Sequence, residues 1–456
     1  SKLVTGNLHT SFYTPGNIII REECWRSISV NLNNNQSYNR FMSGLFFIFM
    51  LLIPFQDSGL SETPLRMFGL YLSNFPLAIM LLLSLLHCYI TGKIKKEYIV
   101  LVSAGCYIII YSLGIVIFRG DDLLLAIYKI ITNGILLFFQ IASFYYAIQY
   151  FPIIKRYIWI VFFVNLLGCL LCDVLSIDLG FLIHRRSLFD MDGRFHGFSS
   201  ETSWFSYTTV ILGCLSSVCT SSKYLKWGYL AISVIIAFLG GSKGVVACIP
   251  LAFVLYSLFA TKRNIFVRFF LLVLTIIISV GIFDIFLSES FEYDLKESTS
   301  FSTRCSSILA GIIIFIHYPF GTGFGSFIPV MRETIIEAFD ILNNYVPIFL
   351  LSSGEIMEML ADPTGSGLAV KSVFFQYLSF FGIPFLLFLC WLIKKAIRIF
   401  RGCKLFYVIV IYFIFISLAT FAQFYYDSII AMATLYMLRL YKNNNYNLQE
   451  KDSRQV

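Results

Sequence analysis

Long apolar runs recur along most of this chain and constrain its fold more than any other feature. A helix needs about 20 apolar residues to cross a bilayer, within a range of roughly 17 to 25. Twelve segments reach or approach that length: Phe41–Phe55 (short), Met67–Ile90, Tyr98–Phe118, Leu123–Tyr150, Tyr157–Val174, Ser203–Thr220, Leu225–Gly240, Val245–Ala260, Phe266–Leu287, Val370–Ile393, Leu405–Phe424 and Ser428–Leu440. The runs predict an all-α, polytopic integral membrane protein with about 12 transmembrane helices.

The charged residues agree with this class. Only 13% of the 456 residues are charged and 58% are hydrophobic, whereas a soluble domain has about 25% charged residues. The net charge of +8 comes from Lys and Arg in short clusters between the apolar runs. Such clusters are typical of membrane topology signals. We therefore expect membrane lipid as a partner and no nucleic acid.

The positive-inside rule gives the orientation. With the N-terminus inside, the five inner short loops hold fifteen Lys and Arg and the outer ones hold three. This asymmetry predicts a cytoplasmic tail over 1–40, a membrane domain over 41–440 and a second cytoplasmic tail over 441–456.

Two long loops then fall on the outer side, at about 178–202 and 288–367. The second contains two apolar pieces, Ile308–Ile316 and Val346–Leu351, both too short to span a bilayer. We expect them to be interfacial or buried helices on the outer face. Each span moves the following loop to the other side of the membrane. If both pieces spanned, the later loops would therefore stay on their predicted sides, and this alternative stays open.

Classical soluble motifs and metal-ligand clusters are absent from the sequence. The five histidines are spread from His9 to His317. Asp190 and Asp192 have the DxD spacing that holds a divalent metal in some enzymes, and we favour the alternative that they belong to a solvated loop. We predict no metal and no cofactor. Cys169 and Cys172, within an apolar run, are expected to be small buried residues. Lys129, within the fourth run, is expected to snorkel to lipid headgroups.

The first outer loop carries an unusual group of arginines. Arg185, Arg186 and Arg194 lie within ten residues, on the side that the positive-inside rule depletes of basic residues. A guanidinium group presents a planar fork of donors that matches phosphate oxygens. We interpret these arginines as a clamp for a pyrophosphate-linked lipid. The alternatives are contact with lipid headgroups or pairing with nearby aspartates.

The second outer loop repeats the pattern. Arg304 opens an apolar helix that ends near His317, and a turn with three glycines follows, at Gly321, Gly323 and Gly325. Glycine lets the backbone approach a ligand closely and adopt positive φ. The alternative is an ordinary helix followed by a flexible loop.

Glu201 is the candidate general base, with His196 and His317 as rivals. It precedes the sixth span, where partial removal from water would make a carboxylate a stronger base. An acid at a helix N-terminus also interacts favourably with the helix dipole, which is an equally simple explanation. Lys243 and Lys371 are within reach of the same face, or they snorkel to headgroups.

Several of these features together resemble a known family. The first loop has Arg186 followed by Gly197, the segment GGSKGVVACIPLAF contains Lys243 in a turn before a helix, and Arg304 to Gly325 forms an Arg, apolar helix, Pro and Gly-x-Gly run. Over roughly Tyr157–Ile393 the chain resembles the bacterial O-antigen polymerases (Wzy type) of the O-antigen ligase/polymerase superfamily.

The resemblance implies a GT-C-like fold in the bacterial inner (cytoplasmic) membrane and a role in lipopolysaccharide or related surface polysaccharide biosynthesis. The implied reaction is an inverting, metal-independent glycosyl transfer at the periplasmic face. Donor and acceptor would both be glycans linked to undecaprenyl pyrophosphate, and a chain-length regulator protein is an expected partner. Arg186, Arg194 and Arg304 would hold the donor pyrophosphate and neutralise the charge that develops on it.

One departure separates the two branches of the superfamily. Ligases carry a His just before the span that corresponds to Val370–Ile393, and here Lys371 is nearest. This favours a polymerase over a ligase and leaves the general base open. The main rival is a flippase for lipid-linked oligosaccharides, which needs polar residues within its spans. A structural assembly subunit is a third class.

Overall fold

The computed structural model describes residues 36–177 apart from 64 and 93–95, then 195–240, 299–345 and 353–400 apart from 364 and 366, with isolated positions elsewhere. Regular structure in these ranges is helical, and the extended contacts are two isolated bridges from Gln56, to Tyr71 and to Ser199. The expected all-α class is therefore confirmed for this part of the chain.

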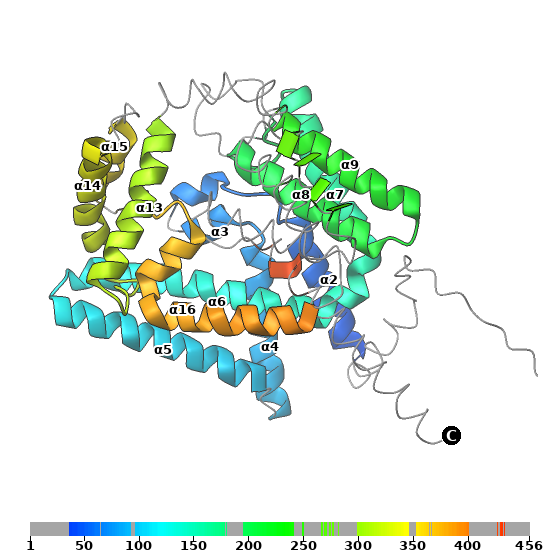
Figure 1. The fold of residues 1–456 in the computed structure, drawn as a ribbon. Helices are drawn as coiled ribbons and strands as arrows, with labels where there is room; N and C mark the ends of the chain where they lie inside the picture. Colours follow the sequence, from blue (N-terminus) through cyan, green and yellow to red (C-terminus); the bar gives the residue numbers. More distant parts are fainter. Residues whose placement is uncertain are drawn as a thin grey trace, which may run out of the picture.

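Figure 1 shows how the described helices are arranged. In chain order they are α2 (Gln36–Leu51), η2 (Gly59–Glu62), α3 (Arg66–Leu70), α4 (Asn74–Thr91), α5 (Lys96–Arg119), α6 (Leu123–Ile154), η3 (Lys155–Tyr157), α7 (Ile158–Gly168), the π-helical η4 (Cys169–Val174), α8 (Thr202–Cys219), α9 (Lys223–Leu239), α13 (Thr299–His317), α14 (Phe327–Tyr345), α15 (Gly354–Ala361) and α16 (Val373–Phe400).

Four helical segments in the described ranges are long and apolar enough to cross a membrane: Asn74–Thr91, Val102–Arg119, Leu123–Val174 and Val373–Trp391. The third has 52 residues and contains two expected spans, divided at the basic turn η3. The membrane class is supported. The number of twelve stays a prediction, since Val245–Ala260 and Leu405–Phe424 lie outside the described residues, as does most of Phe266–Leu287 and Ser428–Leu440.

The expectation of one continuous helix over Met67–Ile90 is wrong. The chain leaves the helical conformation at Tyr71, which is extended and bridges to Gln56. Asn74 then opens α4, and its side-chain amide donates to the carbonyl of Met67 at 2.7 Å. A polar side chain that bonds the preceding backbone competes with helix continuation, so the apolar run divides into α3 and α4.

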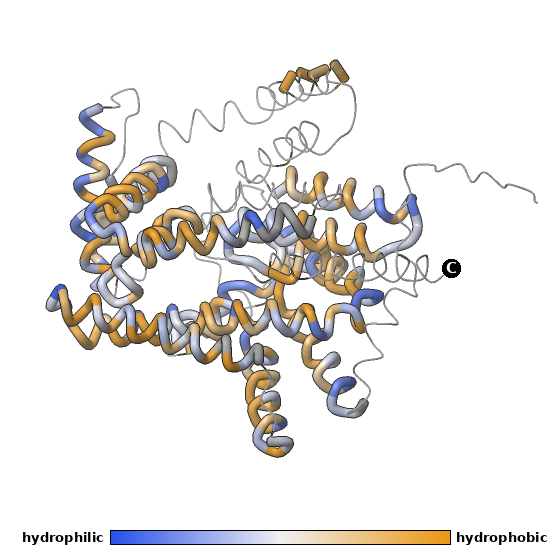
Figure 2. The backbone as a smooth tube through the Cα atoms, turned by 60° about the horizontal axis from the view of Figure 1, so that its bottom comes forward, coloured by the Kyte–Doolittle hydropathy of each residue, from blue (hydrophilic) through white to orange (hydrophobic). Residues whose placement is uncertain are grey.

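Large apolar side chains also cover the outside of several helices. On α5, Ile110, Ile117 and Phe118 are 70%, 74% and 90% exposed. Figure 2 shows hydrophobic stretches extending along most helices, with hydrophilic residues gathered near their ends. Exposed apolar surface on this scale marks contact with lipid or with another protein, as expected for a membrane domain.

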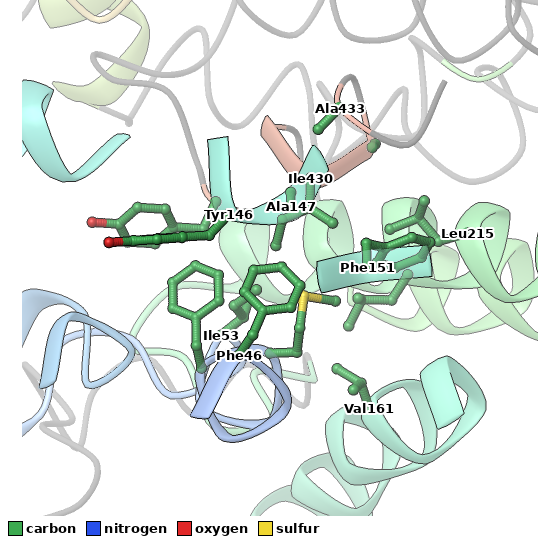
Figure 3. Packing of buried hydrophobic residues seen from close by; sticks show 14 of the residues in the cluster. Phe46, Ile53, Tyr146, Ala147, Phe151, Val161, Leu215, Ile430 and Ala433 are labelled. Atoms are coloured by element: carbon green, nitrogen blue, oxygen red, sulfur yellow. The ribbon is translucent and has the colours of Figure 1, made fainter. Parts of the chain in front are cut away.

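The interior contains two main hydrophobic clusters. The first joins α2, α4, the second half of α6, α7 and α8, with Phe46 and Tyr146 among its fully buried members. Figure 3 shows side chains from these helices meeting Ile430 and Ala433. The second joins α5, the first half of α6, α13, α14, α15 and the start of α16. Helix α6 therefore runs through both clusters.

Helices α13 and α14 pack on each other and stand across the ends of α5 and α6 in Figure 1. The apolar piece Ile308–Ile316 lies within α13, where Ala310 and Ile314 are fully buried. It is thus a packed helix, one of the two expectations for it. Val346–Leu351 lies outside the described residues. Cys169 and Cys172 are both buried, which confirms the expectation for that pair.

Candidate functional site

The end of the first outer loop is held by one carboxylate. Oδ2 of Asp173, in η4, accepts the main-chain N–H of His196 at 2.9 Å and of Gly197 at 2.7 Å. Gly197 has φ +58°, and a Cβ there would lie 2.5 Å from the ring of Phe205. This turn and its packing explain the glycine without a ligand.

Glu201 occupies the N-cap position of α8 and its side chain is exposed. The carboxylate accepts no main-chain N–H of the helix, and it accepts a hydrogen bond from the Ser203 hydroxyl at 3.3 Å. Glu201 therefore lies at a helix N-terminus, where the helix dipole stabilises an acid. Its side chain nevertheless does not cap the helix. Its exposed oxygen atoms are open to a bound molecule.

The main chain of Arg304, in the second outer loop, is joined to that of Lys371, which follows this loop, through one hydroxyl group. The N–H of Lys371 donates to the Ser307 hydroxyl at 3.1 Å, and that hydroxyl donates to the Arg304 carbonyl at 3.0 Å. Both basic side chains are half-buried. The ammonium of Lys371 lies 3.8 Å from Oε1 of Glu355. Sequence reasoning did not single out Glu355, whose acidic position in the first turn of α15 was the available signal.

The neighbouring thiol of Cys305 indicates how far the surroundings of Arg304 are removed from water. Burial raises the pKa of this thiol, and the neighbouring Arg304 charge acts in the opposite direction. The first turns of α13 therefore form a partly desolvated environment, in which the charge of Arg304 is less screened than on an open surface.

His317 and the glycine run lie at the other end of α13. Thirteen residues separate Arg304 from His317, about 20 Å along a helix. The N–H groups of Thr322 and Gly323 donate to the carbonyls of Ser379 and Phe380, both at 2.9 Å.

The glycines pack against neighbouring helices. A Cβ on Gly321 would clash with the main chain at Phe380, one on Gly323 would lie 2.9 Å from Cα of Ser112, and one on Gly325 would clash with Val116. The run therefore docks α13 and α14 onto α5 and α16. Its expected role in binding the same ligand as Arg304 stays a prediction.

Lys129 also departs from expectation. Its side chain is buried, and its Nζ donates to the Gly365 carbonyl at 3.5 Å. It therefore does not snorkel to headgroups. The signal was present in the sequence, because an isolated charge within an apolar span is a functional candidate by default.

The remaining predicted site residues fall outside the described residues: Arg185, Arg186, Arg194 and Lys243, with the pair Asp190 and Asp192. A clamp built from both outer loops stays a prediction. Within the described ranges, no group of three or more His, Cys, Asp or Glu side chains is arranged to hold a metal ion.

Comparison with known proteins gives one informative similarity. The chain is 24% identical over 368 residues to a Klebsiella pneumoniae protein described as "Uncharacterized 49.5 kDa protein in cps region", covering 78% of this chain and 82% of that protein. No family model matches the chain. No solved structure matches it.

Proposed function

We propose that this protein polymerises undecaprenyl-pyrophosphate-linked repeat units into O-antigen or a related surface polysaccharide, at the periplasmic face of the inner membrane. The similarity to a protein from a cps (capsule polysaccharide) region of Klebsiella points to polysaccharide biosynthesis. The apolar helices point to a membrane protein. The polymerase proposal is supported mainly by one observation: the Ser307 hydroxyl joins the main chains of Arg304 and Lys371 near the start of α13, which brings the two basic residues to the same region.

The chemistry explains why this pair matters. In glycosyl transfer from a lipid pyrophosphate, negative charge develops on the leaving phosphate, and fixed cations stabilise it. Arg304 and Lys371 supply two positive charges in a half-buried position. Arg186 and Arg194 would complete the clamp from the first outer loop. Glu201 or His196 would activate the acceptor hydroxyl, since His317 lies at the far end of α13.

The test uses a strain in which the chromosomal copy is deleted and replaced by variants. We expect Arg304→Ala and Lys371→Ala to remain in the membrane at parental amounts and to yield glycolipid with a single repeat unit. Lys223→Ala is the matched control, because this exposed lysine lies at the opposite end of α8 from Glu201, and it should keep long polymer. Long polymer at parental levels in both test variants would contradict the proposal.

The buried Lys129 is an observation in favour of the rival flippase, since transporters place charged residues within their spans. The deletion strain separates the two functions. A polymerase leaves single repeat units at the cell surface, whereas a flippase leaves them trapped on the cytoplasmic side. A ligase would leave finished polymer on its lipid carrier.

A further inference from the structure

The buried ammonium group of Lys129 lies among other cations. Its Nζ donates to the Gly365 carbonyl, and Arg332 of α14 donates to the carbonyls of Asp362 and Pro363 in the same short segment. The charge of Arg66 in α3 also repels the ammonium, and that of Asp362 attracts it. These residues come from α3, α6, α14 and the segment after α15. Together with Lys129 itself, the described groups that interact here are three cations and one carboxylate. Burying unbalanced charge is costly unless an opposite charge is supplied.

Arg332 is held in a fixed orientation within this group. Its Nη2 donates to the carbonyls of Asp362 at 2.6 Å and Pro363 at 2.9 Å. Its Nε–H is buried and has no hydrogen-bond partner within the part of the chain that the structure describes. A guanidinium that is oriented in advance and retains a free donor suits a phosphate oxygen, because little side-chain freedom is lost on binding.

The position of the group also suits the head of a lipid. Lys129 lies seven residues after Asp122, the N-cap of α6, which is about 10 Å along the helix axis. Arg66 and Arg332 are only half-buried, so the group is open to its surroundings on their side. An anion carried on an apolar tail reaches this depth more readily than a free ion does.

We propose that Lys129, Arg66 and Arg332 form a binding site for the diphosphate group of a lipid-linked sugar. The choice of this ligand rests on the proposed function. The two excess positive charges match the charge of a diphosphate diester. The site is separate from the Arg304–Lys371 pair, which touches the other end of the segment between α15 and α16.

A purely structural role makes a different prediction. Cations near a helix C-terminus stabilise its last carbonyl groups, and Arg332 bonds the two carbonyls that directly follow α15. If Arg332 only stabilises the end of α15, replacing its side chain lowers the stability of the protein by the same amount with or without pyrophosphate. A ligand that binds the folded state raises stability in proportion to the logarithm of its concentration, so the response to ligand distinguishes the two roles.

The experiment measures the thermal unfolding midpoint of the purified full chain in detergent, titrated with undecaprenyl pyrophosphate. We expect the midpoint of the parent to rise with the lipid and, more weakly, with inorganic pyrophosphate. In a chain that also carries Arg304→Ala, so that the first clamp does not mask the result, Lys129→Met and Arg332→Gln should weaken the response to both ligands at least tenfold. Lys129→Arg should retain binding, which guards against loss through misfolding. Arg119→Gln is the matched control, since Arg119 is already paired with Asp121.

Three outcomes would overturn the site. One is an unchanged response in Lys129→Met and Arg332→Gln, and another is a lower midpoint with an unchanged response to ligand. The third is an equal response of the parent to phosphatidylglycerol, which would identify an ordinary headgroup contact. The polymerase proposal fails separately, through repeat units trapped inside the deletion strain, so the two failures are distinguishable.

Discussion

At Asp173, a single carboxylate oxygen accepts two main-chain N–H groups that follow it by 23 and 24 residues. Hydrogen bonds to a charged acceptor are roughly twice as strong as neutral ones. The aromatic ring of Phe198, next in the chain, stacks on Phe55 at a centroid distance of 4.3 Å. The carboxylate and this stacked pair together fix the start of α8, and with it the position of Glu201.

We expect Asp173→Ala to lower the free energy of unfolding by about 3 kcal/mol, because each of two bonds to a charged group contributes about 1.5 kcal/mol or more. Asp173→Asn keeps an acceptor oxygen and should cost less. Denaturant unfolding of the purified protein in detergent measures both values. Parental stability in Asp173→Ala would show that these two bonds do not hold the loop.

Single residues also show the limits of the sequence. Arg304 stands out because it opens an apolar helix in a polar interval, and the structure places it beside the predicted Lys371. Arg332 was not singled out, since its role depends on carbonyls about 30 residues later in the chain. Such long-range contacts leave no periodic signal. The expectation that Lys129 snorkels is wrong: its place within an apolar span marks it as a functional candidate, but the sequence does not show whether its side chain turns inward or toward the headgroups.

Among the helices, α16 has the least regular backbone. Gly382 has φ +54° and ψ −133°, and Pro384 lacks the N–H that would bond Phe380 four residues earlier. The freed carbonyls of Ser379 and Phe380 accept from the turn after α13, and the N–H of Ile383 donates to Pro319 at 2.7 Å. Hydrogen bonds lost within one helix are thereby replaced by bonds to another element.

This exchange predicts a large effect at one glycine. A Cβ at Gly382 would clash with the Pro319 carbonyl, and its positive φ disfavours any other residue. We expect Gly382→Ala to lower the free energy of unfolding by about 2 kcal/mol or more. Gly44→Ala in α2 has nothing within 4 Å of the new Cβ and should gain up to about 1 kcal/mol. Thermal midpoints of both variants test this; equal midpoints would contradict the strained kink.

For the elements in general, apolar length predicted most of the described helices to within a few residues. Expected Ser203–Thr220 corresponds to α8 and expected Tyr98–Phe118 to α5. The two places where the observed helices differ from the expected ones have the same cause. The division between α3 and α4, and the kink of α16, arise where main-chain groups bond to distant segments. Hydropathy alone contains no information on such pairings.

Across the whole molecule, α6 connects two separate hydrophobic clusters. Its side chain Gln140 accepts a hydrogen bond from Tyr377 of α16 at 3.3 Å, close to where the clusters meet. Glu201 and the turn before α9 lie at opposite ends of α8. The charge asymmetry of the loops predicts that these two ends lie on opposite sides of the membrane.

That placement can be tested by cysteine labelling. We expect Glu201→Cys to react with a membrane-impermeant maleimide in intact spheroplasts, because the first outer loop is predicted to be periplasmic. Ser222→Cys, which is also exposed, should react only after permeabilisation. The parent measures the background from its own cysteines. Reaction of both positions from the same side would contradict a spanning α8 and the twelve-span topology.

The docking of the glycine turn on α16 has a consequence for evolutionary divergence. Apart from the Thr322 hydroxyl, which donates to the Ser379 carbonyl at 3.1 Å, the hydrogen bonds between the turn and α16 join main-chain atoms, so they constrain the identity of few side chains. Gly321, Gly323 and Gly382 are the residues that this contact requires, because a side chain there would clash. Relatives are therefore expected to keep these glycine spacings while most other positions drift, and a search by spacing should find proteins that overall identity misses.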